Sequence, residues 1–324
     1  MTARPTPRPP KKRGGDKGRR AAEVIDVGRR RITVSHPDKV LFEDVGATKL
    51  DLARYYEWVA PVMVPHVRDH PVAMQCFPDG VNRPGYYMKN IPGYFPSWIS
   101  RATLDKRGGT ITQVLAHDAA TLVYLASQNC VTPHTWLSRA DKPHHPDRLI
   151  FDLDPTRKRF AEVRAAARAL GELLRDLDLA PFAMTTGSRG LHVVVPLRRS
   201  VEFDGARRFT RDVARVLAAG DPRRLTIEQR KEKRGERIFI DINRNAYAQH
   251  AAPPYAVRGL PRAPVAAPLH WGELDDRRLD PQRWTIRNLA ARLRAEGDPW
   301  REIARHARAL GPAIQRLSES ARPA

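Results

Sequence analysis

The amino-acid sequence predicts a mixed α/β (α+β) protein built around an RRM-like β-sheet. Between residues 149 and 241, strand-like and helix-like segments follow in the order β-α-β-β-α-β, the order of ferredoxin-like and RRM-like units. Short apolar runs indicate the strands, and apolar residues three or four positions apart indicate the helices. Upstream, residues 23–128 show hairpin and helix patterns, which predict an N-terminal α/β module packed against this sheet.

The N-terminal end of the chain is predicted to be a disordered basic tail over residues 1–22. Residues 1–20 are rich in Pro, Gly and positive charge and hold nothing that builds a core. Such a tail either binds DNA electrostatically or is an inert leader, and the sequence leaves both open. Order is expected to begin near Glu23, with a hairpin of residues 24–27 and 31–34 around Gly28.

Two helices are expected in the N-terminal module. Residues 48–63 carry apolar residues at helical spacing, and Thr48 is a suitable N-cap. Residues 118–128 have a second helical pattern. The stretch from Pro78 to Pro96, between these helices, is rich in Pro and Gly and is expected to be a loop.

The RRM-like unit is expected to run from Leu149 to the strand that contains Asp241. Its expected elements are strands at residues 149–154, 182–186 and 191–197, helices at about 159–178 and 204–219, and a turn at 187–190. Beyond this unit, residues 301–324 are expected to form a basic helix or tail.

The charge balance makes a polyanion the expected partner. The 324 residues include 57 Lys and Arg against 36 Asp and Glu, a formal net charge of +21, which most often serves nucleic-acid binding. A generally Arg-rich proteome is the alternative explanation. Cys76 and Cys130 lack the spacing of a metal site, and no apolar run reaches the length of a membrane span. We therefore expect a cytoplasmic, nucleoid-associated protein with no membrane partner.

Three acidic residues in strand-like segments suggest metal-dependent chemistry. Asp152 and Asp154 alternate with Leu153, so both point to one face of a strand. Two carboxylates in an apolar strand repel each other unless a cation lies between them, and oxygen ligands favour Mg²⁺ or Mn²⁺. If the strand of Asp241 is the neighbour, the three acids could hold two metal ions for nucleotidyl transfer. A surface strand end and a metal-dependent nuclease are the alternatives for the acids alone.

The turn at residues 187–190 is a candidate phosphate-binding element. Its backbone N–H groups, the Ser188 hydroxyl and the Arg189 cation could meet phosphate oxygens, and His192 starts the next strand within reach. An ordinary hairpin turn beside a structural histidine is the alternative.

In this order, the motifs resemble the polymerase domain of bacterial multifunctional ligase D, in the archaeo-eukaryotic primase superfamily. The resemblance covers about residues 30–290 and rests on segments 35–41, 78–80, 134–139, 146–155, 186–192, 254–259 and 271–274, together with Asp241. It implies a primase–polymerase catalytic core over residues 23–300. Because no Lys-x-Asp-Gly ligase motif is present, a stand-alone polymerase is expected.

The resemblance also implies roles for particular side chains. It makes Asp152, Asp154 and Asp241 the catalytic, metal-binding acids. It implies DNA contacts through Lys39 and Lys49, which would hold a 5′-phosphate, and through Tyr86 and Tyr87, which would stack on the template. Solvated lysines, core aromatics and structural ion pairs are the alternatives. The implied nucleotide-binding residues are His134, Thr186, Ser188, Arg189, His192, Arg244 and Arg258.

The implied activity is that of a DNA-dependent DNA/RNA polymerase, a nucleotidyltransferase. It would extend primers and fill short gaps at DNA ends in double-strand break repair by non-homologous end joining. The resemblance implies two Mn²⁺ (or Mg²⁺) ions, a preference for ribonucleotides, and NTPs or dNTPs and 5′-phosphorylated gapped or broken DNA as substrates. Ku and a separate DNA ligase are the implied partners. A primase, an excision-type gap-repair polymerase and a non-catalytic DNA-end-bridging module stay open as alternatives.

Overall fold

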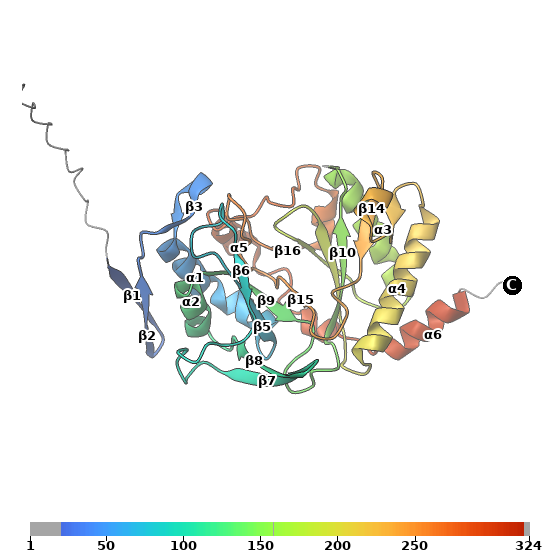
Figure 1. Cartoon of the computed structure of the whole chain (residues 1–324). Coiled ribbons are helices and arrows are strands. Elements are labelled where there is room, and N and C mark those ends of the chain that lie inside the picture. Colours follow the sequence, from blue (N-terminus) through green and yellow to red (C-terminus); the bar gives the residue numbers. More distant parts are fainter. Residues whose placement is uncertain (1–20, 158, 321–324) are drawn as a thin grey trace, which may run out of the picture.

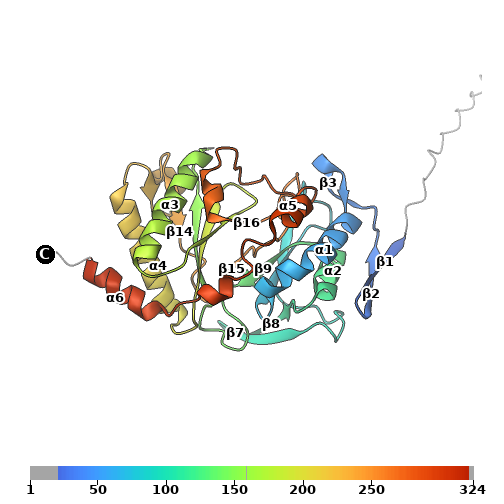
Figure 2. The same ribbon diagram turned by 180° about the vertical axis from the view of Figure 1, so that it is seen from behind.

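Two six-stranded β-sheets stand side by side, and helices cover the outer side of each (Figures 1 and 2). Two further sheets of two strands each lie in the described N-terminal part. The computed structural model describes residues 21–157 and 159–320. Most of the expected N-terminal tail, residues 1–20, lies outside these described residues. The first strand, β1 (Ala22–Val27), begins one residue before the expected start of order. The expected α/β class, with a second module packed against an RRM-like sheet, is confirmed.

The RRM-like sheet has the strand order β13-β14-β10-β12-β11-β16. Its central strand, β10 (Arg148–Asp154), pairs antiparallel with β14 (Ile238–Asp241) on one side and with β12 (Leu191–Pro196) on the other. Together with the helices that follow β10 and β12, this is the expected β-α-β-β-α-β order. The remaining strands of the sheet are β11 (Phe182–Thr185), β13 (Leu225–Thr226) and β16 (Pro268–Leu269).

Helices α3 (Phe160–Asp176) and α4 (Phe203–Gly220) cover one face of this sheet. Their buried residues recur every three or four positions, as the sequence predicts. Phe151 and Leu153 of β10 pack in the same core as these helices, whereas Ile150 packs in the core of the other half. Because side chains alternate along a strand, the acids of β10 face away from α3 and α4.

The second sheet has the order β15-β9-β5-β8-β7, with β6 paired to β5. This sheet was not predicted, because the sequences of β5 and β9, which are buried on both faces, lack an alternating pattern. The stretch that was expected to be a loop contains the short strand β6. The strands are β5 (Pro71–Cys76), β6 (Tyr86–Met88), β7 (Arg101–Lys106), β8 (Gly109–Leu115), β9 (Cys130–Trp136) and β15 (His250–Ala251).

Helices α1 (Lys49–Val67) and α2 (Ala119–Ser127) pack together on the outer side of the second sheet. Thr48 is the N-cap of α1, as predicted, and forms a reciprocal capping box with Asp51. Asp118 caps α2, because its carboxylate accepts a hydrogen bond from the backbone N–H of Thr121. Each expected helix is therefore present, with its start fixed by a polar side chain.

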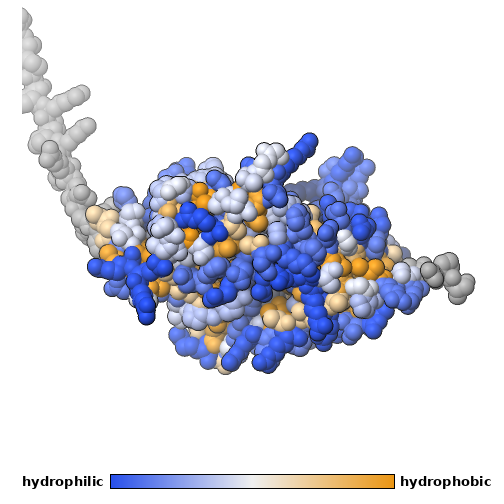
Figure 3. All heavy atoms as spheres, turned by 90° about the horizontal axis from the view of Figure 1, so that it is seen from below, coloured by the Kyte–Doolittle hydropathy of each residue, from blue (hydrophilic) through white to orange (hydrophobic). Residues whose placement is uncertain are grey.

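The remaining elements lie at the ends of the molecule and between the two halves. The described part of residues 301–324, expected to be a basic helix or tail, contains the helix α6 (Leu310–Ser320). The face of the molecule seen from below is covered largely by hydrophilic side chains (Figure 3). None of the helices in the described residues is apolar and long enough to cross a membrane. These remaining elements are β2 (Arg30–Ser35), β3 (Val40–Phe42), β4 (Ala47–Thr48), α5 (Leu289–Glu296), α6 (Leu310–Ser320) and the 3-10 turns Glu43–Val45, Lys231–Lys233, Trp271–Asp275 and Ile303–His306.

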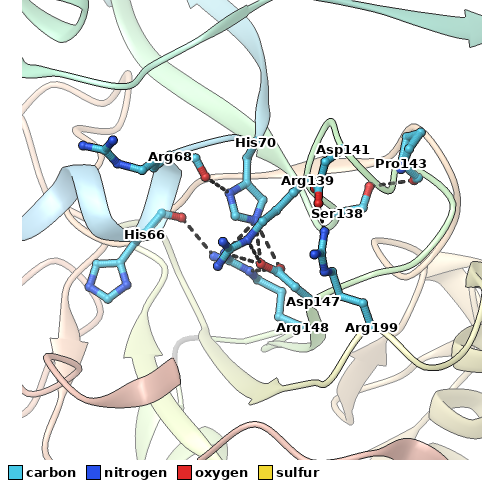
Figure 4. A network of polar contacts seen from close by, with 10 residues as sticks. All are labelled: His66, Arg68, His70, Ser138, Arg139, Asp141, Pro143, Asp147, Arg148 and Arg199. Carbon is cyan, nitrogen blue, oxygen red and sulfur yellow. Dashed lines mark hydrogen bonds and ion pairs between the residues drawn. The ribbon is translucent and has the colours of Figure 1, made fainter. Parts of the chain in front are cut away.

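A buried ionic network joins the two halves (Figure 4). The Asp147 carboxylate, just before β10, accepts hydrogen bonds from Arg148 Nε at 2.9 Å and Arg139 Nε at 3.0 Å. His70, just before β5, lies 3.0 Å from the same carboxylate. Arg148 also donates to the carbonyl oxygen of His66 at the end of α1. This network fixes the β10 strand of the RRM-like sheet against α1 and β5 of the N-terminal module.

Candidate active site

A cavity of about 210 Å³ lies between the two sheets and has walls from both. The first wall belongs to the RRM-like sheet and its turn at residues 187–190, and the second to β6, β9 and β15. Two of the three predicted catalytic acids and all seven predicted nucleotide-binding residues line it. The lining residues are Tyr87, His134, Asp152, Asp154, Thr186, Ser188, Arg189, His192, Arg244, His250, Ala251, Ala252 and Arg258.

The acids are brought together by the register of the central strands. Asp152 of β10 lies directly opposite Asp241 of β14 and, on the other side, directly opposite His192 of β12. Residues that face each other across antiparallel strands project to the same face, and Asp154 follows two positions after Asp152. The four side chains therefore share the face that borders the cavity, as expected if β10 and β14 are neighbours.

The two acids of β10 differ in their electrostatic surroundings. Burial, together with the negative charge of Asp152, raises the pKa of Asp154 to about 6. Burial also acts to raise the pKa of Asp152, but His192, with Nε2 at 3.6 Å from Oδ2, outweighs it and lowers that pKa. Oδ1 of Asp152 is buried without a hydrogen-bond partner. At Asp154, burial and repulsion by Asp152 therefore outweigh the nearby positive charges of Arg189 and His192.

The donor set fits a divalent cation, although it is not assembled as a finished metal site. Within residues 21–157 and 159–320, no three His, Cys, Asp or Glu side chains are grouped so that they could hold a metal ion as they stand. Oδ1 of Asp241 accepts a hydrogen bond from the backbone N–H of Asn243 at 2.8 Å. The unpartnered Asp152 oxygen and the raised pKa of Asp154 are what hard oxygen ligands show without their cation. The residues therefore fit Mg²⁺ or Mn²⁺.

The turn after β11 is held in place by Thr186. Its hydroxyl oxygen accepts hydrogen bonds from the backbone N–H groups of Ser188 and Gly190, each at 3.2 Å, and donates to the carbonyl of Gly190. Two of the backbone N–H groups that were predicted to bind phosphate, those of Ser188 and Gly190, therefore already donate to Thr186. The hydroxyl of Ser188 and the guanidinium of Arg189 are left to line the cavity.

Glycines allow this turn to approach its neighbours. A Cβ atom at Gly190 would lie 2.1 Å from the carbonyl oxygen of Leu153, between the two acids of β10. Gly187 has φ +63° and packs against Arg258, whose Nη1 donates to the carbonyl oxygen of Thr186 at 2.7 Å. Arg258 is nearly enclosed, and burial lowers its pKa, while the negative charge of Asp152 acts in the opposite direction. The turn, the acids and this arginine thus form one packed unit.

Three aromatic rings form the opposite wall of the cavity. Tyr87 and His134 have ring centroids 5.3 Å apart, and His250 lies 5.4 Å from Tyr87 and 5.3 Å from His134. Burial and the positive charge of Lys89 lower the pKa of His250 to about 4, and burial and Arg258 lower that of His134 well below its usual value. Both histidines are therefore neutral near pH 7.

His250 was missed by the sequence analysis. It lies in a strand of only two residues, outside every motif, so no pattern in the sequence marks it. Tyr87, which was expected on the template, lies in this ring cluster, and its hydroxyl is 3.4 Å from Nε2 of His134. The neighbouring Tyr86 is exposed and does not line the cavity.

Lys39 and Lys49 lie together outside the cavity, where β3 meets the start of α1. The backbone N–H of Lys49 donates to the carbonyl of Lys39 at 2.8 Å, and Lys49 Nζ lies 3.3 Å from the hydroxyl of Ser35. Burial, and then the charge of Lys39, lower the pKa of Lys49. Lys39 is partly exposed and is 3.7 Å from Asp79. Two adjacent lysines, one of them buried, form a local concentration of positive charge suited to an anion.

An RRM-like sheet with clustered acids, facing a pocket of arginines and histidines, defines the nucleotidyltransferase class of primase–polymerase architecture. The chain belongs to the LigD primase–polymerase domain family, which matches residues 48–300. Members of this family are nucleotidyltransferases, and the family implies divalent metal ions.

Curated relatives carry the same domain within longer chains. The multifunctional non-homologous end joining DNA repair protein LigD of Mycobacterium tuberculosis is 34% identical over 277 residues, covering 83% of this chain and 36% of that protein. The multifunctional LigD of Pseudomonas aeruginosa is 29% identical, and the match covers 95% of this chain and 37% of that protein. The bifunctional LigD of Bacillus subtilis is 27% identical, and the match covers 83% of this chain and 43% of that protein. The chain therefore spans less than half the length of each of these relatives.

A solved structure supports the same assignment. The polymerase domain of Mycobacterium tuberculosis ligase D, solved in complex with DNA, aligns with a TM-score of 0.82 and 33% sequence identity. The alignment covers 86% of this chain and all of that domain. The fold of the whole catalytic part, including the second sheet that the sequence analysis missed, is therefore that of a LigD polymerase domain.

Proposed function

We propose that the protein is a template-dependent nucleotidyltransferase that extends a primer 3′-OH and fills short gaps at broken DNA ends. It would serve double-strand break repair by non-homologous end joining and prefer ribonucleotides. One observation carries the proposal: acids, arginines and histidines from two sheets line a single cavity. That combination suits a triphosphate whose charge must be neutralised while a hydroxyl attacks it.

The acids are proposed to hold two divalent metal ions, Mn²⁺ by preference and Mg²⁺ otherwise. Asp152 and Asp154 would bind both ions, and Asp241 would complete the site next to the primer terminus. When bound, such ions would favour deprotonation of the attacking hydroxyl and offset the negative charge of the phosphates. His192, 3.6 Å from Asp152, would keep this carboxylate ionised and orient it.

The cationic and polar residues of the cavity are proposed to bind the incoming nucleotide. Arg189, Arg244 and Arg258 would pair with phosphate oxygens, because a guanidinium donates two parallel hydrogen bonds to such groups. Thr186 would hold the turn in shape, as its hydroxyl already accepts two backbone N–H groups. The polar side chains proposed to contact the nucleotide beside them are His134, Ser188 and His192.

Lys39, Lys49 and Tyr86, which lie outside the cavity, and Tyr87, which lines it, are proposed to bind DNA. Lys39 and Lys49 would hold the 5′-phosphate at the downstream edge of a gap, because the two side chains are close enough for the charge of Lys39 to lower the pKa of Lys49. Tyr86 and Tyr87 lie on β6 and are 49% and 46% exposed, so their rings are available to template bases. Tyr87 would then meet both the template and the nucleotide pocket. We further propose Ku and a DNA ligase as partners at the break.

Primer extension on a short gapped duplex tests the function. The downstream strand is supplied with or without a 5′-phosphate, NTPs are compared with dNTPs, and Mn²⁺ is compared with Mg²⁺, with Asp152→Ala as the control. We expect metal-dependent addition, faster with NTPs and Mn²⁺, stimulated by the phosphate and lost in Asp152→Ala. Intact DNA binding without extension under any condition would replace the polymerase with a DNA-end-bridging module.

A further inference from the structure

The only two cysteines of the chain lie side by side on β5 and β9, and β9 also carries His134 of the aromatic wall. Cys76 ends β5, Cys130 begins β9, and the two residues are direct partners in the antiparallel register. Each residue is 1% exposed, and both thiols are free. Direct antiparallel partners have Cα atoms about 4.5–5.5 Å apart, within the range that a disulfide bridges.

The register changes at this pair. Gln75 faces Thr132, and the next residue, Cys76, faces Cys130, so an extra residue of β9 bulges out between them. Bulges of this kind bend a strand and re-aim its side chains. A hydrogen bond between the thiols lowers the pKa of Cys76, and burial raises the pKa of Cys130 well above its usual value. Cys76, whose sulfur also lies 3.9 Å from the carbonyl oxygen of Met74, is therefore the better nucleophile.

We propose that Cys76 and Cys130 are an oxidation site at which a hydroperoxide forms a disulfide between β5 and β9, and that this bond changes nucleotide binding. The Cys76 thiolate attacks the outer oxygen of the hydroperoxide and breaks the O–O bond, which leaves a sulfenic acid and an alcohol or water. Cys130 then attacks the sulfenic sulfur, the S–S bond forms, and the hydroxyl leaves as water with the thiol proton. The peroxide takes up both electrons. A thiol reductant reverses the reaction.

Contacts on both strands connect this pair to the cavity. Gln75, next to Cys76, has Oε1 3.2 Å from Nε2 of His134. On the other side of Cys76, the Phe77 ring lies so close to Gly259, the residue after Arg258, that a Cβ there would be 2.4 Å from it. A shift of β5 at Cys76 therefore moves the supports of a histidine and an arginine that line the cavity.

The partner strand has a similar connection. The hydroxyl of Thr132, two residues after Cys130, donates to the carbonyl oxygen of Val257 at 2.6 Å. Val257 directly precedes Arg258, which lines the cavity. A bond that draws β5 and β9 together thus acts on both sides of Arg258. This effect on nucleotide binding rests on the proposed function, whereas the oxidation itself does not.

Thiol chemistry on the full chain tests the oxidation. The protein is treated with hydrogen peroxide, quenched, denatured and alkylated, and its intact mass is measured. We expect a monomer that has lost two hydrogens and takes up no alkylating agent, with both thiols restored by dithiothreitol. Cys130→Ala should give no reversible loss of this kind. Two alkylated thiols after peroxide, or a bond between two chains, would overturn the proposal.

Nucleotide binding provides the second readout. The affinity for a fluorescent ribonucleoside triphosphate is compared for reduced, oxidised and re-reduced protein. We expect oxidation to weaken binding severalfold, dithiothreitol to restore it, and peroxide to leave the affinity of Cys130→Ala unchanged. An intramolecular disulfide with unchanged affinity would show that the bond is not coupled to the cavity. Failure of the reduced protein to bind nucleotide at all would instead count against the proposed function.

Discussion

Asp152 of β10 and Asp241 of β14 face each other across the antiparallel centre of the RRM-like sheet. The pairing places an acid from the end of the unit beside one from its beginning, 89 positions earlier in the sequence. Of these two acids, Asp152 lines the cavity, whereas Asp241 does not and accepts a hydrogen bond from the backbone N–H of Asn243. The relationship predicts that the two acids act as a pair only when a cation draws Asp241 toward Asp152.

Asp241→Asn tests this pairing. The amide keeps the size of the side chain but removes one of the negative charges proposed to bind metal, so we expect primer extension to fall by about a thousandfold, equivalent to roughly 4 kcal/mol. Extension rates over a Mn²⁺ titration provide the measurement. Asp212→Asn, on the exposed side of α4, is the matched control and should extend normally. A rate within twofold of wild type (about 0.4 kcal/mol) would remove Asp241 from the metal set.

The raised pKa of Asp154 predicts how stability depends on pH. Because its pKa is about 6 in the folded protein and near 3.8 otherwise, the folded state holds a proton that the unfolded state has lost between these values. Metal-free protein should therefore lose on the order of 1–3 kcal/mol as pH rises from about 4 to about 6. Asp154→Asn should remove this loss and raise the melting temperature at pH 7 in EDTA.

Thermal unfolding from pH 4 to pH 8 checks this expectation, with and without Mn²⁺. Added Mn²⁺ should stabilise the wild type above pH 6 but give Asp154→Asn a much smaller gain, because a protonated or neutral group is a poor metal ligand. Equal stabilisation of the two proteins by Mn²⁺ would show that Asp154 does not bind the metal.

How much of this site the sequence predicts depends on the kind of strand that carries each residue. The alternation along 149–154 predicts that Asp152 and Asp154 share a face, because that strand has one face on α3 and α4 and its acids on the other. The sequence could say only that the three acids would meet if β10 and β14 were neighbours. Their pairing itself depends on tertiary structure, which brings distant strands together. His250 could not be predicted, because a strand of two residues has no periodicity.

The second sheet was missed for a related reason. All seven residues of β9 are buried, and it contains Pro133, so neither alternation nor local propensity marks it as a strand. It is central only because β5 and β15 pair with it on either side. Helices α1 and α2 were predicted because helical spacing is a local pattern, to which the N-cap Thr48 adds a second local signal for α1.

Lys49→Ala is expected to abolish stimulation by a downstream 5′-phosphate while extension on unphosphorylated gaps continues. The loss follows because Lys49 is the buried member of the Lys39–Lys49 pair and is proposed to hold that phosphate. The slope of log affinity against log salt should also become shallower by about 0.9 on phosphorylated duplex DNA. Lys106→Ala on β7 is the charge-matched control. Undiminished stimulation in Lys49→Ala would place the phosphate elsewhere.

Gly190→Ala is expected to displace Asp152 and Asp154, because it would push the turn against the backbone of Leu153 between them. The added Cβ would lie 2.1 Å from the carbonyl oxygen of Leu153, so the turn or β10 must move, at a cost of about 1–3 kcal/mol. We expect a lower melting temperature together with a loss of extension larger than the loss of DNA binding. Gly220→Ala, where no atom lies within 4 Å of the added Cβ, is the control. Normal stability in Gly190→Ala would contradict the close approach.

The Asp147 network predicts how the stability of the protein falls at acid pH. Burial alone would raise the pKa of Asp147, but the charges of Arg148 and His70 outweigh it and hold that pKa well below its usual value. The unfolded chain therefore binds a proton at Asp147 near pH 4, whereas the folded chain binds it only at lower pH. This stabilisation is present at neutral pH and is lost as pH falls below about 4.

Asp147→Asn should lower the free energy of unfolding by about 3–5 kcal/mol at pH 7, since it leaves Arg148 buried without its partner. The variant should also lose less stability than the wild type as the pH falls into the acid range. Urea unfolding at pH 3, 5 and 7 measures both effects. The control is Asp141→Asn, because Asp141 is exposed where it pairs with Arg199. A variant that lost as much stability as the wild type at acid pH would show that other carboxylates cause the loss.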